Sequence, residues 1–69
     1  MIKVLVLGTK NYDYDFFYFF KSIGYECFFC GNQKSSLIPD EQWISIDFTD
    51  VENIIKFLNQ NPHFKYVIP

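Results

Sequence analysis

The fold of this chain is decided by its first nine residues, which read Met1-Ile2-Lys3-Val4-Leu5-Val6-Leu7-Gly8-Thr9. Residues 4–7 are apolar without alternation, which is typical of a parallel strand covered by helices on both faces. Gly8 follows at once, and glycine permits the close backbone turn that leads from such a strand into a helix. We expect the remaining elements to pack around this strand.

The composition limits the chain to one small domain. Its 69 residues bury only about 60% of the surface that the unfolded chain exposes. Aromatic residues make up 22% of the sequence, which is more than so small a core needs, so some should face a partner or another part of a larger protein. The net charge is −2 with no arginine, which disfavours nucleic acid as a partner.

Two further features concern location. No apolar run approaches the roughly 18 residues of a membrane span, and the N-terminus lacks the layout of a signal peptide. Cys27 and Cys30 lie in a stretch that reads as a strand, where this spacing points the two thiols to opposite faces. With His63 as the only histidine, a four-ligand zinc site is not expected. These observations favour a cytoplasmic protein with two buried thiols.

The first helix is expected over residues 11–23. Apolar residues recur there at helical spacing, and the stripe they form consists of Phe16, Phe19, Phe20 and Ile23. Asn11 or Thr9 could cap its start. Gly24 should end it in the left-handed conformation.

The second helix is expected to begin at a capping box, in which Thr49 and Glu52 each bind the backbone N–H of the other. Pro62 ends the helical pattern, because the residue before proline is pushed away from helical angles. The apolar stripe of this helix consists of Val51, Ile54, Ile55 and Leu58.

Three more strands are expected, at residues 25–30, 43–47 and 64–68. Strands that alternate with helices indicate an α/β fold with a parallel sheet. We predict a three-layer, Rossmann-like half of a doubly wound fold, with four strands in the order 3-2-1-4 and two main helices. The last strand is then an open edge, so Tyr66, Val67 and Ile68 should dock on more sheet, in a second copy or in a longer protein.

The turn after the first strand is the candidate ligand site. A dinucleotide site would need G-x-G-x-x-G there, but Lys10 and Asp13 stand where the second and third glycines belong. A conventional NAD site is therefore disfavoured. The residues that could contact a small polar ligand are Gly8, Thr9, Lys10, Asn11 and Tyr12.

Other polar residues have simpler structural interpretations. Residues 11–15 also suit helix capping, with two tyrosine rings packed on the sheet. Asp47 and Asp50 could be paired carboxylates, but an acid near a helix start stabilises the helix. His63 lies in a surface loop away from the predicted crevice. No catalytic residue and no metal ligand is expected.

The order of four segments resembles one family. The segments are residues 1–9, residues 21–26 (KSIGYE), residues 46–50 (IDFTD) and residues 66–69 (YVIP). Together they are similar to the N-terminal pre-ATP-grasp domain of ATP-grasp ligases, the group of carbamoyl phosphate synthase large chains and carboxylate–amine ligases. The resemblance covers nearly the whole chain, residues 1–69, and implies a domain that supplies part of the acceptor-substrate crevice.

In such a ligase a downstream ATP-grasp domain binds Mg-ATP. Its ATP and metal residues have no counterpart among residues 1–69, so the isolated chain is expected to be inactive and to hold no cofactor. Two other hypotheses stay open. One is a Rossmann-like nucleotide-binding or epimerase-type module, and the other is a small self-associating interaction domain.

Overall fold

The computed structural model describes residues 1–8, 13–32 and 36–69. Within these described residues, four strands, two α-helices and one short 3₁₀ turn follow one another. In order they are β1 (Lys3–Leu7), α1 (Asp13–Ser22), β2 (Glu26–Cys30), the 3₁₀ turn Asp40–Gln42, β3 (Trp43–Ile44), α2 (Val51–Gln60) and β4 (Phe64–Ile68).

The four strands form one parallel sheet in the order β3-β2-β1-β4. This confirms the predicted α/β fold with its 3-2-1-4 order, and it makes the opening strand central. β1 pairs with β2 along its whole length, from Lys3 opposite Glu26 to Leu7 opposite Cys30. On its other side Val4 lies opposite Tyr66. β4 is an edge strand.

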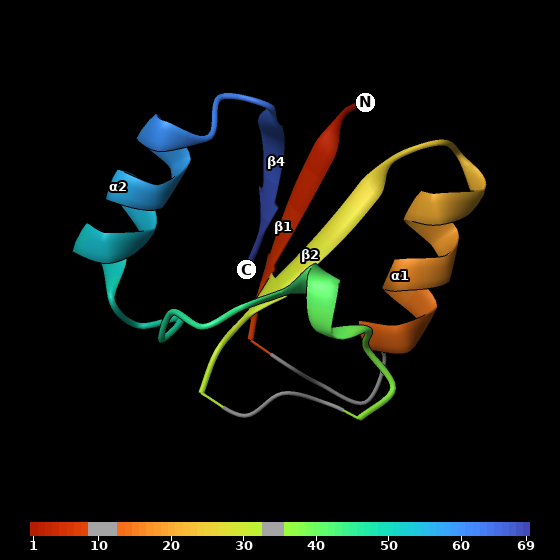
Figure 1. The fold of residues 1–69 in the computed structure, drawn as a ribbon, viewed down its shortest axis with the longest axis horizontal. Helices are drawn as coiled ribbons and strands as arrows, with labels where there is room; N and C mark the ends of the chain where they lie inside the picture. The colour runs from red at the N-terminus through yellow and green to blue at the C-terminus, as the bar shows by residue number, and fades with distance from the viewer. Residues whose placement is uncertain (9–12, 33–35) are drawn as a thin grey trace.

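The two helices lie on opposite sides of the sheet (Figure 1). Consequently the sheet separates two apolar clusters. The α1 side holds Val6, Cys27, Phe29 and Ile38, with Phe16, Phe17, Phe20, Trp43 and Ile68 packed around them. The α2 side holds Leu5, Cys30 and Ile54, with Leu7, Phe28, Ile44, Ile46, Leu58 and Phe64 packed around them. The prediction that Cys27 and Cys30 point to opposite faces is confirmed.

Two glycines have the positive φ angles that turns of this kind require. Gly8, which ends β1, has a φ of 87°, and Gly24, which follows α1, has a φ of 83°. Residues other than glycine rarely adopt such φ angles. The glycine at the end of β1 and the glycine at the end of α1 therefore follow the prediction.

The buried face of α1 differs from the predicted stripe. Phe17, rather than Phe19, packs on the sheet together with Phe16 and Phe20. Phe19 is 57% exposed and Ile23 is 50% exposed. Six of the ten residues of α1 are phenylalanine or tyrosine, and they lie on several sides of the helix. Periodicity alone therefore could not select the face that contacts the sheet.

The capping box predicted for α2 is wrong. Asp50 is the N-cap, and its side chain accepts a hydrogen bond from the backbone N–H of Asn53. Thr49 instead donates its hydroxyl to Asp47. Along the helix Ile54 is buried and Leu58 packs on the core. Val51 and Ile55, the other two members of the predicted stripe, are 62% and 52% exposed.

The third strand is shorter than predicted. β3 contains only Trp43 and Ile44, which pair with Phe29 and Cys30. The chain bends at Ile46, whose side chain still packs in the α2-side cluster. None of the helices in the described ranges is long and apolar enough to cross a membrane.

Candidate functional site

The carboxyl ends of the strands meet at one edge of the sheet, which is the edge where the sequence predicts a ligand crevice. The backbone N–H of Gly8 donates to the carbonyl of Cys30 at 2.7 Å, which holds the ends of β1 and β2 together. Gly31 is buried directly beyond β2. A Cβ at Gly31 would lie 3.7 Å from the Gly8 Cα and 3.3 Å from Trp43 Cη2. The two turns therefore pack backbone against backbone.

The ring of Phe48 covers this pair of glycines. Its atoms lie 3.9 Å from the positions that a Cβ would take at Gly8 and at Gly31. Phe48 is nevertheless 47% exposed, so part of the residue is accessible to a ligand. The sequence analysis did not identify Phe48 as a site residue. The signal was present, because two glycines that each follow a neighbouring strand indicate a close approach by another group.

Asp47 lies beside Phe48 and is held by hydrogen bonds. Its Oδ1 accepts from the backbone N–H of Thr49 at 2.8 Å and from the Thr49 hydroxyl at 2.7 Å. The backbone hydrogen bond is the largest cause that lowers the pKa of Asp47, followed by the Thr49 hydroxyl and the Asn32 side chain. The carboxylate is therefore charged at neutral pH, and it disfavours a phosphate at this edge.

Cys30 is the last residue of β2 at this edge, but its thiol is not activated. Burial raises the pKa of the Cys30 thiol, the Gly8 backbone lowers it, and the negative charge of Asp47 raises it. The side chain is only 1% exposed. Because the thiolate rather than the thiol attacks electrophiles, this cysteine is expected to be inert in the folded protein.

The structure places one of the five predicted ligand residues. Gly8 lies at the carboxyl edge, between the turn after β2 and the Phe48 ring. Thr9, Lys10, Asn11 and Tyr12 lie outside the described residues.

Three other polar positions have structural surroundings. Asp50 accepts at both carboxylate oxygens from Asn53, at 3.3 Å from the backbone and 2.6 Å from the side chain. His63 is exposed at the amino end of β4, where its carbonyl accepts from the Lys3 N–H. The expectation that the Tyr14 ring packs on the sheet is wrong. Its hydroxyl donates to the Tyr18 hydroxyl on the exposed side of α1, which raises the pKa of Tyr14.

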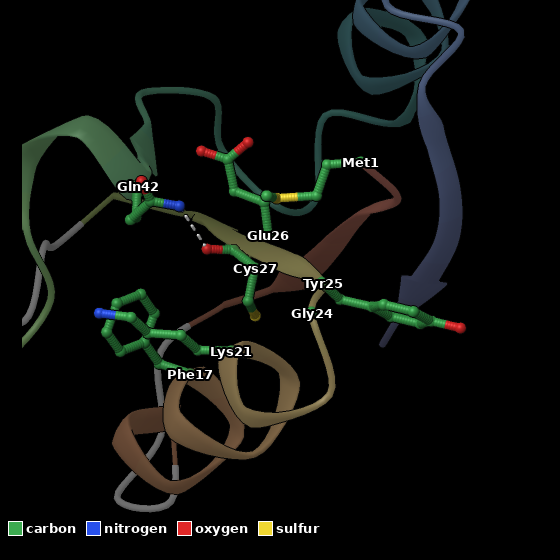
Figure 2. Close-up of a pocket in the computed structure, with 8 residues that line it drawn as sticks. All are labelled: Met1, Phe17, Lys21, Gly24, Tyr25, Glu26, Cys27 and Gln42. Atoms are coloured by element: carbon green, nitrogen blue, oxygen red, sulfur yellow. Dashed lines mark hydrogen bonds between the residues drawn. The ribbon is translucent and has the colours of Figure 1, made fainter.

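A half-open cavity of about 300 Å³ lies at the opposite edge of the sheet, between α1 and the amino end of β2 (Figure 2). Gln42 points into the region and donates its amide to the Cys27 carbonyl at 2.9 Å. The Lys21 ammonium stays 5.8 Å from the centre of the Phe17 ring. Glu26 points away from Lys21, on the other side of the strand (Figure 2). The polar groups do not converge, so the cavity has no evident ligand chemistry.

Within residues 1–8, 13–32 and 36–69 no cluster of three or more His, Cys, Asp or Glu side chains could hold a metal ion. Comparisons with known protein families, with curated proteins and with solved structures returned no match.

Proposed function

We propose that this chain is the N-terminal substrate-crevice and structural domain of an ATP-dependent carboxylate–amine ligase of the ATP-grasp group. The observation that carries the proposal is the strand order β3-β2-β1-β4. It sets the carboxyl ends of β1 and β4 side by side, at the switch point where folds of this kind bind ligands. The order of the four sequence segments supports the same family.

In this role the chain supplies a wall of the crevice and no catalytic group. The exposed part of Phe48 and the Gly8 turn would contact the acceptor substrate, while the charged Asp47 keeps phosphate away from this edge. Mg-ATP would be bound by the downstream ATP-grasp domain, which forms the acyl phosphate. The two free cysteines are compatible with the cytoplasmic location of such a ligase.

Sequencing of the transcript beyond the codon for Pro69 tests the proposal directly. We expect an in-frame segment that encodes an ATP-grasp domain. A native reading frame that stops at Pro69, with no ATP-grasp segment encoded next to it, would count against the proposal. Tight binding of NADH or of a nucleotide by the isolated chain in calorimetry would favour the nucleotide-binding alternative.

A variant in the ligase tests the crevice wall. Phe48→Ser removes the ring that covers Gly8, and we expect it to raise KM for the acceptor about tenfold while KM for ATP changes little. Leu37→Ser is the matched control. Leu37 is also an exposed apolar residue, but it lies in a different turn, between β2 and the 3₁₀ turn. Two outcomes would contradict the assignment of Phe48 to the crevice wall. One is an equal rise in KM for the acceptor in both variants, and the other is a change of KM for ATP alone in Phe48→Ser.

A further inference from the structure

Phe48 lies in a short turn between β3 and α2, and this turn is closed by hydrogen bonds of its own. The backbone N–H of Asp50 donates to the carbonyl of Asp47 at 2.9 Å. Across the same turn, Asp47 Oδ1 accepts from the backbone N–H of Thr49 at 2.8 Å and from its hydroxyl at 2.7 Å. One carboxylate oxygen thus joins the two sequence neighbours of Phe48 and fixes the backbone on either side of the ring.

The same carboxylate connects this turn to the sheet. The side chain of Asn32, just beyond β2, is hydrogen-bonded to Asp47. The residue before it is Gly31, which the Phe48 ring covers. The charge of Asp47 is also close enough to Cys30, the last residue of β2, to raise the pKa of that thiol. Asp47 therefore links the turn that carries the ring to the strand end that the ring covers.

Packing by itself restrains the Phe48 ring only weakly. Because the residue is 47% exposed, much of its apolar surface gains nothing from burial. Gly8 and Gly31 present backbone atoms to the ring and have no side chains that could interlock with it. The position of the ring therefore depends on the interactions that hold its backbone, and these interactions converge on Asp47.

We propose that Asp47 is a positioning residue of the candidate site, which holds the Phe48 ring over Gly8 and Gly31 and thereby sets how tightly the acceptor substrate binds. Asp47 acts through Phe48 and makes no contact with the acceptor. The statement about the acceptor rests on the proposed function, whereas the statement about the ring concerns this chain alone. The role requires an oxygen that accepts hydrogen bonds, so asparagine can replace Asp47 in part and alanine cannot.

NMR spectroscopy of this chain measures the position of the ring. An aromatic ring shifts the resonances of protons that lie close to it, so the Hα resonances of Gly8 and Gly31 report on Phe48. The difference between the wild type and Phe48→Leu gives the contribution of the ring to these resonances. We expect Asp47→Ala to lose most of this contribution and Asp47→Asn to keep most of it.

Asp50→Ala is the matched control, because the carboxylate of Asp50 accepts from Asn53 at the start of α2. It should leave both glycine resonances near their wild-type values. Circular dichroism checks that each variant is folded. If Asp47→Ala does not fold, Thr49→Val decides, since it removes one donor to Asp47 and should lose part of the ring contribution. The inference is overturned if Asp47→Ala or, in its place, Thr49→Val loses nothing. Equal losses in Asp47→Ala and Asp50→Ala, or in Asp47→Ala and Asp47→Asn, would overturn it too.

In the ligase, a double-mutant cycle separates positioning from a merely structural role. Asp47→Ala should raise KM for the acceptor by up to about tenfold, as expected for Phe48→Ser, while KM for ATP changes little. Because Asp47 acts through the ring, Asp47→Ala added to Phe48→Ser should raise KM no further. Two effects that multiply would overturn the inference. If Phe48→Ser alone leaves KM for the acceptor unchanged, the proposed function fails, while the NMR result still decides whether Asp47 holds the ring.

Discussion

At the scale of single residues, backbone angles explain the glycine that follows α1. Gly24 has a positive φ, and a Cβ added there would meet no atom within 4 Å. Its conformation alone, rather than space, therefore selects glycine at this position. Gly31 differs, since its Cβ would lie close to the Trp43 ring and the structure records no positive φ there.

We expect Gly24→Ala to lower the free energy of unfolding by about 1 kcal/mol, because alanine is strained at positive φ. Gly24→Asn should lower the free energy of unfolding by less, since asparagine tolerates the left-handed conformation better than alanine does. Urea unfolding of the two variants and the wild type measures the difference. Equal stability of the alanine and asparagine variants would show that the backbone angle is not the reason for glycine.

The hydrogen bonds to Asp47 predict a pH dependence of stability. They lower its pKa in the folded protein, while the unfolded value is about 3.9. A carboxyl with a lowered folded pKa stabilises the protein above the unfolded pKa, and this stabilisation is lost as pH falls through the folded pKa. The stability advantage of the wild type over Asp47→Asn should therefore be fully present above about pH 5 and shrink below about pH 4.

Urea unfolding at a series of pH values measures this dependence. Thr49→Val removes the hydroxyl donor and keeps the backbone donor, so it should reduce the dependence without abolishing it. If the difference in unfolding free energy between the wild type and Asp47→Asn stays constant from about pH 5 to about pH 2, the hydrogen bonds to Asp47 are not the cause of the pH dependence.

At the scale of elements, the sequence predicts where segments lie better than which side they bury. The strand over Val4–Leu7 and the end of α1 at Gly24 follow from local chemistry, since an unbroken apolar run and a glycine each have few alternatives. The buried face of α1 is different. Phe17 and Phe19 are equally apolar, and only the position of the sheet and the 3₁₀ turn decides that Phe17 packs and Phe19 does not.

The start of α2 shows a second limit of local patterns. Thr49 and Asp50 are both good N-cap residues, and a box with Glu52 favours the first. In the structure Asp47 takes both the hydroxyl and the N–H of Thr49. Thr49 is thereby held in the turn, and Asp50 caps the helix instead. The candidate site depends on the same turn, because it carries Phe48 to the glycines, and no short-range pattern predicts that contact.

The choice of cap is testable. Asp50→Ala should lower the free energy of unfolding by about 1 kcal/mol, which is the usual effect of losing an N-cap. Asp50→Asn should keep most of the stabilisation that the cap provides, because asparagine is also a good N-cap residue. Glu52→Ala is the control, and we expect it to change stability by less than about 0.5 kcal/mol. Thermal unfolding of the three variants would support the predicted capping box instead if Glu52→Ala were the more damaging change.

At the scale of the whole molecule, the stability of this chain depends on a small number of fully buried side chains. Phe29 is fully buried in β2, within the α1-side cluster. Truncation of a buried phenylalanine to alanine typically costs about 3–5 kcal/mol. Small domains have only about 5–15 kcal/mol in total, and this one has few other large buried side chains to compensate.

We therefore expect Phe29→Ala to leave a large unfolded population at room temperature, and Phe29→Leu to remain folded with reduced stability. Near-ultraviolet and far-ultraviolet circular dichroism, followed through a urea titration, measures both. A Phe29→Ala variant that keeps more than half of the wild-type unfolding free energy would mean that the α2-side cluster can hold the sheet by itself.

The two cysteines provide a way to observe each layer separately. Cys27 lies under α1 and Cys30 lies under α2, yet they are only three positions apart in the sequence. Both side chains are buried, so a thiol reagent can reach each of them only when the packing around it opens. A single proteolytic peptide carries both, so mass spectrometry of that peptide after timed alkylation reads the opening rates of the two layers from one sample, with no engineered probe.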